Sequence, residues 1–174
     1  MIFGYRSRNI YTYEINLVTI PRPTCLDATL SIARTISEKH NNIIFIDINV
    51  QMYATGKCSL SARIMSTEPL AIELPRIDEH NVIFSEERLL IIQSHPTILC
   101  SALEIPRIEI HASRADDYLL PLATELGAQL MQSSEECKLV IHTSLSSIYE
   151  VLKKISEVVK YCRVKHVHIR YDNR

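Results

Sequence analysis

The chain has 174 residues, of which 47% are hydrophobic and 22% are charged, and its formal net charge at pH 7 is -1. A chain of this size and composition forms one globular domain whose core does not depend on disulfides or metals. The sequence has no apolar N-terminal block typical of a secretory signal, and no stretch approaches the roughly 20 apolar residues of a membrane span. We therefore expect a soluble cytoplasmic protein that does not contact a membrane.

The five cysteines are widely spaced and odd in number, and they form no Cys-x-x-Cys pair: Cys25, Cys58, Cys100, Cys137 and Cys162. Neighbouring histidines that could complete a zinc site with them are also missing from the sequence. This pattern predicts reduced thiols, as in a cytoplasmic protein, and no metal centre.

The first half of the chain predicts a strand, a helix and further strands. Residues 11–20 alternate with a period of two, as in a half-buried strand. Thr24 then stands as an N-cap for a helix whose apolar stripe consists of Leu26, Leu30, Ala33 and Ile36. The β-branched run 43–50 predicts another strand, and residues 62–95 read as an antiparallel meander of short strands.

The second half predicts three strands and two helices. The strands cover residues 105–111, 137–142 and 165–171. One helix begins at Ser113, bends at Pro121 and ends at Gly127, and a strongly amphipathic helix begins at Ser144. We therefore predict a single α+β domain over residues 1–174, with a mostly antiparallel sheet of six or more strands and about three helices, the last two on one face.

Residues 53–64 carry a thiol, hydroxyls and two cations between two strand-like segments, which is where binding groups tend to be presented. A phosphate-binding loop is excluded, because Gln51 and Cys58 occupy the places of its glycine and its Ser or Thr. A dinucleotide-binding turn is excluded as well, since the chain has no Gly-x-Gly-x-x-Gly. Cys58 is a candidate nucleophile, because Lys57 and Arg63 favour a thiolate; the alternative is an inert thiol in a surface turn.

The same segment resembles a known family. Six residues follow the order of the motif Tyr-Thr-Thr-Ser-Ser-Cys-Ser-Gly-Arg-Ile: Tyr53, Thr55, Cys58, Ser59, Arg63 and Ile64. This motif is the hallmark of the wybutosine-synthesis proteins that methylate tRNA at the third step of that pathway. Segments 108–111, 123–127 and 139–144 look like the strand, helix and strand that follow in the family. The chain departs from the motif at Lys57 and at residues 60–62.

The resemblance implies a tRNA methyltransferase that uses S-adenosylmethionine, with catalytic residues Cys58, Ser59, Arg63 and His111. Methyl transfer depends more on positioning and electrostatics than on a strong acid or base. In this interpretation Arg63 holds a carboxylate or phosphate and His111 orients a polar group. The alternatives are that Arg63 is a solvated strand residue and that His111 caps or borders the sheet.

The C-terminal segment is cationic, with seven Lys and Arg against two acids in residues 151–174. Alternation places His166, His168 and Arg170 on one face of the last strand. We predict an RNA-binding surface, for tRNA or another RNA, with Tyr161 or Tyr171 stacking on bases. It comprises Lys160, Arg163, Lys165, His166, His168 and Arg170.

Two alternatives apply to this segment. The cations can simply solvate an exposed face, and a metal site at His166 and His168 lacks an identifiable third ligand. The rival to the methyltransferase is a non-catalytic subunit that binds RNA or assembles with protein partners through this basic face.

Overall fold

The structure is a computed structural model, and it describes residues 5–76, 82–94, 105–113, 119–133, 136–159 and 164–173, without the side chains of 5–8 and 82–94. The strands in chain order are β1 (Tyr5–Pro21), β2 (Ile43–Met52), β3 (Lys57–Ser66), β4 (Val82–Ser94), β5 (Arg107–Ala112), β6 (Gln129–Gln132), β7 (Cys137–His142) and β8 (Val164–Asp172). The helices are α1 (Arg22–Glu38), α2 (Leu119–Leu126) and α3 (Ile148–Val159), with short 3-10 turns η1 (His40–Asn42) and η3 (Leu145–Ser147).

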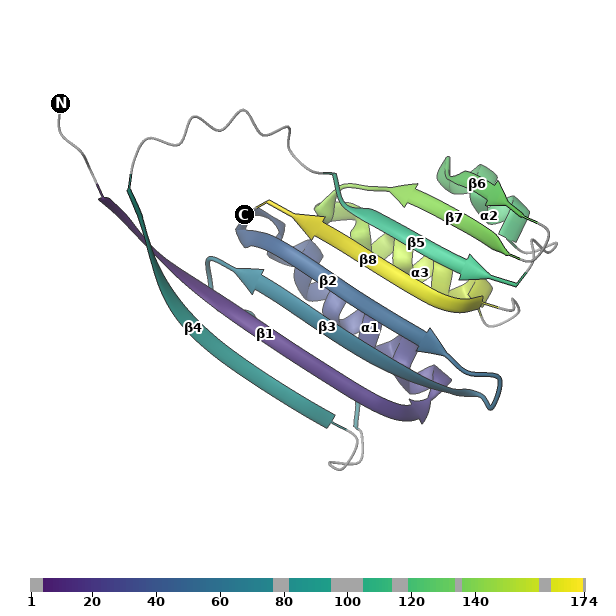
Figure 1. Cartoon of the computed structure of the whole chain (residues 1–174), viewed down its shortest axis with the longest axis horizontal. Helices are drawn as coiled ribbons and strands as arrows, with labels where there is room; N and C mark the ends of the chain where they lie inside the picture. Colours follow the sequence, from purple (N-terminus) through teal and green to yellow (C-terminus); the bar gives the residue numbers. More distant parts are fainter. Residues whose placement is uncertain are drawn as a thin grey trace.

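The strands form one eight-stranded sheet with the order β4-β1-β3-β2-β8-β5-β7-β6 (Figure 1). Neighbouring strands pair antiparallel throughout. The predicted α+β class with a mostly antiparallel sheet is therefore confirmed. The last strand of the chain, β8, lies in the middle of the sheet between β2 and β5, so both halves of the chain meet there.

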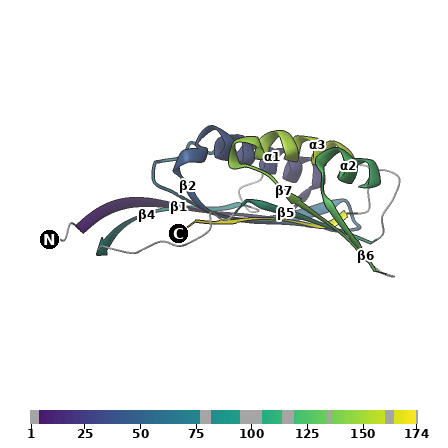
Figure 2. The ribbon, with the colours of Figure 1, turned by 90° about the horizontal axis from the view of Figure 1, so that it is seen from above.

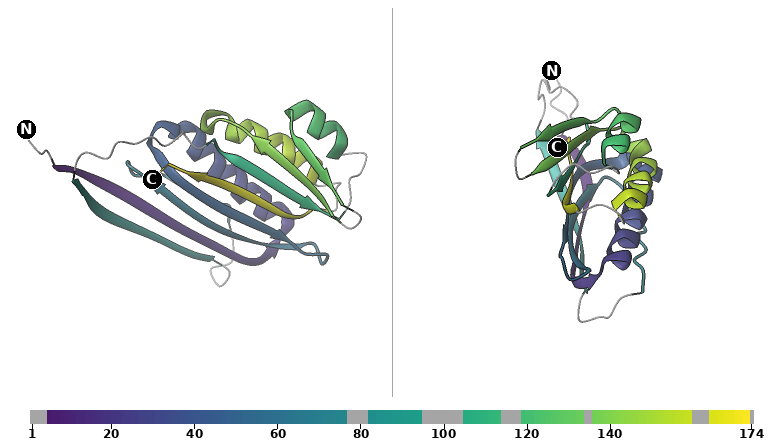
Figure 3. Two further views of the ribbon diagram at one scale, coloured as in Figure 1. Left: turned by 45° about the horizontal axis from the view of Figure 1, so that its top comes forward. Right: turned by 90° about the vertical axis from the view of Figure 1, so that its right-hand side faces the viewer.

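All three helices lie on one face of the sheet (Figure 2 and Figure 3). We call this the covered face. The last two helices, α2 and α3, lie on this face as predicted (Figure 2). Helix α1 lies on the same face and packs against α3. The core lies between the two layers, and its fully buried side chains include Ile15, Ile46, Ile64, Ile110 and Ile169. The described part of the chain places no helix on the opposite side, which we call the open face.

Two local predictions are corrected by the structure. Helix α1 begins at Arg22 rather than after Thr24, so Pro23 is its second residue. Proline is tolerated there, because the N–H groups of the first helical turn have no partner within the helix and the missing N–H of proline costs no hydrogen bond. Residues 62–95 are not a meander of short strands. Instead β4 is a single long strand that pairs with β1 from Leu17 to Tyr5. Pairing along a long neighbouring strand outweighs the local sequence preferences from which short strands were predicted.

Other predicted features fall partly outside the described residues. Pro121 lies in the described helix α2, but the segment between Ser113 and that helix is not described. No helix in the described ranges is long and apolar enough to span a membrane.

Candidate binding surfaces

Residues 53–64 form only a short turn followed by a strand. The turn covers residues 53–56 and is closed by a hydrogen bond from the Tyr53 N–H to the Lys57 carbonyl at 2.9 Å. Gly56 has a φ of 80°, a left-handed conformation that glycine adopts without a steric penalty. Residues 57–64 therefore belong to a strand and not to the connection between strands, because Cys58, Ser59 and Arg63 lie in β3.

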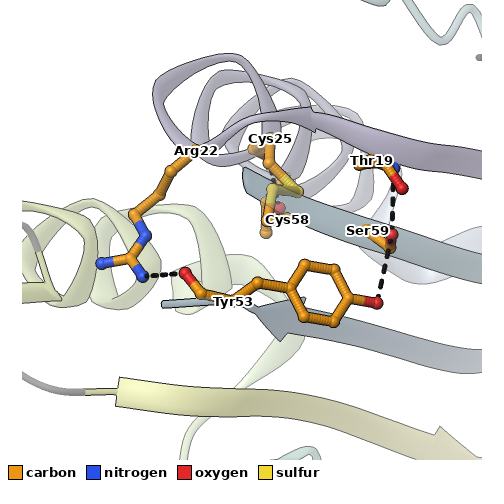
Figure 4. The surroundings of a disulfide bond; sticks show 7 residues. Thr19, Arg22, Cys25, Tyr53, Cys58 and Ser59 are labelled. Carbon is orange, nitrogen blue, oxygen red and sulfur yellow. Dashed lines mark hydrogen bonds between the residues drawn. A yellow bond between two sulfur atoms is a disulfide. The ribbon is translucent and has the colours of Figure 1, made fainter. Parts of the chain in front are cut away.

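Cys58 is fully buried on the covered face and forms a disulfide with Cys25 of α1 (Figure 4). Alternation along β3 directs Cys58 toward the helices, and the two Cα atoms are 6.4 Å apart. The expectation of reduced, unpaired cysteines is thus wrong for this pair. A nucleophilic thiolate at Cys58 is also excluded in this state, because its sulfur is bonded to another sulfur and shielded from solvent.

The other predicted site residues that the structure describes lie on the open face, except Lys165. Strand pairing places Ser59 opposite Gln51, Gln51 opposite His166, and His166 opposite His111. His168 and Arg170 follow His166 on the same face of β8, where they alternate with buried residues. The two predicted clusters therefore share one surface, which the spacing in sequence did not reveal.

The four predicted catalytic residues nevertheless do not converge. Strands β2 and β8 separate β3 from β5, so Ser59 and His111 are roughly 14 Å apart across three strand spacings. Arg63 is turned toward β1, where its Nε lies 3.3 Å from Glu14 Oε1. Ser59 Oγ accepts a hydrogen bond from the Thr19 N–H at 3.0 Å and so supports the irregular end of β1.

Three histidine rings form a row on the open face. The ring centroids of His111 and His166 are 5.5 Å apart, and those of His166 and His168 are 6.0 Å apart. His166 Nε2 donates to Asn49 Oδ1 at 3.0 Å, and His168 Nε2 donates to Asp47 Oδ1 at 2.8 Å. No group of His, Cys, Asp or Glu in the described ranges is arranged to hold a metal ion.

The environment of His166 favours its neutral form. Burial lowers the pKa of this imidazole, and the neighbouring His111 and His168 lower it further, against a smaller opposite effect of Glu109. A neutral ring that donates from Nε2 retains Nδ1 as an acceptor. His166 thus offers a hydrogen-bond acceptor at the centre of the row rather than a positive charge.

Glu109 is the centre of a second network on the open face. Its side chain is 17% exposed, and its carboxylate contacts Arg107, His111 Nε2 at 3.3 Å and Lys138 Nζ at 3.4 Å. Burial raises the pKa of this carboxyl, but the hydrogen bond from His111 and the charges of Arg107 and Lys138 outweigh burial and lower it. Glu109 is therefore ionised and fixes the side chains around it.

The remaining predicted RNA contacts are only partly placed. Lys160, Arg163 and Tyr161 lie outside the described residues. Tyr171 is 7% exposed on the covered face, because it alternates with Arg170, so it cannot stack on a base as predicted. Lys165 is exposed at the start of β8 and lines a separate groove.

This groove, which we call the end groove, has a volume of about 440 Å³. It lies where β2 and β5 end and β8 begins, and it is lined by Arg22, Met52, Tyr53, Ala54, Ser113, Val164 and Lys165. Tyr53 and Ala54 belong to the turn at residues 53–56, within the segment that the sequence indicates as a candidate site. Arg22 was not predicted, because in sequence it lies between two prolines ahead of the expected helix, and its contact with Tyr53 is long-range.

Comparisons with known proteins do not assign the chain to a family. No family model matches it, and no curated protein matches it. A solved structure of the acetolactate synthase small subunit from Thermotoga maritima aligns over 92% of each chain, with 12% sequence identity and a TM-score of 0.29. This similarity is too low to define the fold family or the function of the chain.

The methyltransferase function expected from the sequence is therefore wrong. Its four catalytic candidates do not share a pocket, and Cys58 is enclosed in a disulfide on the other face of the sheet. The described residues instead form a polar surface that runs across β3, β2, β8 and β5.

Proposed function

We propose that this chain is a non-catalytic subunit that assembles with a partner protein through the open face of its sheet. The observation that carries this proposal is the organised polar surface across β3, β2, β8, β5 and β7. Its side chains are held in place by hydrogen bonds and ion pairs, as in the networks around Asp47 and Glu109. A pre-organised surface loses little side-chain entropy on binding, which favours association.

The charges on the open face favour a protein over RNA. Acidic residues alternate with cations and a histidine along it: Glu14 pairs with Arg63, Glu109 pairs with Arg107, and Asp47 accepts a hydrogen bond from His168. A phosphate backbone is bound by continuous positive potential, and these carboxylates interrupt it. Mixed charges with hydrogen-bonding groups are typical of the rim and polar parts of protein interfaces.

The aromatic side chains also favour a protein partner. Sheet surfaces that bind single-stranded RNA present exposed aromatic rings for stacking. In the described part of the open face, Phe45 is 9% exposed, and the Tyr171 ring lies on the other face. Among the described residues, the rings that remain at this face are the histidine row and Tyr53, which is 41% exposed and whose hydroxyl lies 3.5 Å from Ser59 Oγ.

Site-specific photocrosslinking in cells tests the proposal. A photoreactive residue is placed at Arg63 or Arg170 on the open face, and at Lys153 on the exposed side of α3 as the control. We expect adducts of one defined protein from the two open-face positions and none of that protein from position 153. The partner is then purified, and Arg170→Glu is expected to weaken its binding at least tenfold, which corresponds to about 1.4 kcal/mol, whereas Lys153→Glu leaves binding unchanged.

Two results would contradict this function. Adducts that disappear after ribonuclease treatment would identify RNA as the partner. Equal crosslinking from position 153 and from the open face would show that the sheet surface has no specific role.

A further inference from the structure

We infer that the end groove binds a small organic anion, either a carboxylate or a phosphate monoester, with an apolar body. Two cations line it, Arg22 at the start of α1 and Lys165 at the start of β8. No acidic residue is among the described residues that line the groove. The site is distinct from the partner surface proposed above, and its function does not depend on that proposal.

Arg22 is held in a fixed position beside the β2–β3 turn. Its Nη2 donates a hydrogen bond to the Tyr53 carbonyl at 3.2 Å (Figure 4). The Arg22 N–H also donates to the Gly56 carbonyl at 3.1 Å. The disulfide of Cys25, three residues along α1, fixes the same end of the helix to β3. The guanidinium is thus pre-organised rather than free in solvent.

The guanidinium also retains capacity to bind an anion. Its Nε is buried and has no hydrogen-bond partner in the described part of the chain, and no carboxylate there forms an ion pair with it. A buried donor of a charged group is costly to leave unpaired, so an acceptor that reaches it gains affinity. Helix α1 has no acidic residue in its first turn, so the positive end of its dipole adds to this potential.

The rest of the groove suits an apolar body rather than a bare inorganic ion. Met52 and Val164 contribute apolar surface and are 6% and 3% exposed, and Tyr53, which also lines the groove, is 41% exposed. Ser113 adds a polar residue to the lining. Ligand pockets are typically roughly 300 to 1,000 Å³ and mostly apolar with a few polar groups, and the end groove has both properties.

Titration calorimetry on the full chain tests this site with three probes of similar shape. Phenyl phosphate and phenylacetate carry an anionic group, and benzyl alcohol is the neutral control. We expect at least one anion to bind at least tenfold more tightly than benzyl alcohol. The stronger of the two anions identifies whether the groove prefers a phosphate or a carboxylate.

Charge-neutralising variants locate the binding. Arg22→Gln and Lys165→Gln are each expected to weaken the anion at least tenfold, and Lys153→Gln on α3 is the matched control that leaves it unchanged. Lys165→Gln keeps the hydrogen bond between Arg22 and Tyr53, so it remains informative if Arg22→Gln does not fold. Arg170→Glu, which tests the open face, is expected to leave anion binding intact.

The inference is overturned by any of three results. One is no heat from either anion at about 10 mM, well above the roughly millimolar Kd of a weak small ligand. Another is equal binding of all three probes, which would show that charge plays no part. The last is unchanged affinity in Lys165→Gln together with unchanged affinity in a folded Arg22→Gln protein.

Discussion

Cys25 near the start of α1 and Cys58 in β3 are joined by a disulfide across the covered face of the sheet. The bond ties the helix layer to the strand that follows the β2–β3 turn. It therefore fixes the place where Arg22 meets the Tyr53 carbonyl and where the end groove opens.

Removing this disulfide is expected to destabilise the fold. The two cysteines are 33 residues apart, and closing a loop of that size corresponds to about 3 to 4 kcal/mol in the chain-entropy model. We expect the double variant Cys25→Ala/Cys58→Ala to lose at least this much free energy of unfolding, measured by urea titration. A reductant should lower the stability of the wild type and leave that of the double variant unchanged. If the reductant leaves the free energy of unfolding of the wild type unchanged, the disulfide does not contribute to stability.

His166 is expected to make stability depend on pH. Burial, with His111 and His168 nearby, lowers the pKa of His166 in the folded protein below the value of about 6.5 in an unfolded chain. The unfolded state then binds more protons, so this contribution is fully present above about pH 6.5 and is lost as pH falls through the folded pKa. In His166→Gln, the free energy of unfolding should fall less steeply with decreasing pH over this range.

The measurement is urea unfolding at a series of pH values for the wild type and the variant. His142→Gln, which removes an exposed imidazole from β7, is the matched control for the substitution itself. Parallel slopes for His166→Gln and the wild type would contradict the assignment.

Tyr13 anchors the irregular segment that follows β3. Its hydroxyl accepts a hydrogen bond from the Leu70 N–H at 2.7 Å, and both residues are buried. In Tyr13→Phe the N–H stays buried without this acceptor, so we expect a loss of roughly 1 to 3 kcal/mol in the free energy of unfolding. Hydrogen exchange at the Leu70 amide should accelerate. Tyr53→Phe, which removes an exposed hydroxyl, is the control and should change stability by less than about 0.5 kcal/mol.

Thr19 has a φ of 51°, a left-handed conformation that is unfavourable for a β-branched residue. Thr19→Gly relieves this strain, and we expect the free energy of unfolding to rise by about 1 kcal/mol. Its neighbour Val18 is 50% exposed and does not share this conformation, so Val18→Gly should lower stability instead. Thermal or urea unfolding of both variants checks this, and a change of the same sign in both would rule out strain at Thr19.

Several elements were predictable because their signals are local. Alternation along residues 11–17 predicted which side of β1 faces the core, and alternation from His166 to Arg170 predicted which residues of β8 remain accessible. The amphipathic period of α3 likewise predicted its buried stripe, including Leu152 and Ile155. A period of two or 3.6 residues is a property of the chain itself, and burial on one side follows from it.

The candidate sites depended on contacts between distant segments, which no local pattern encodes. The sequence by itself determined the α+β class, most of the elements and the faces of the strands. Only the tertiary structure decided that β8 lies between β2 and β5, which places His166 beside His111 and separates both from Ser59. It also decided that Cys58 faces Cys25 and that Arg22 and Lys165 line one groove, because strand order and helix docking follow from packing of the whole core.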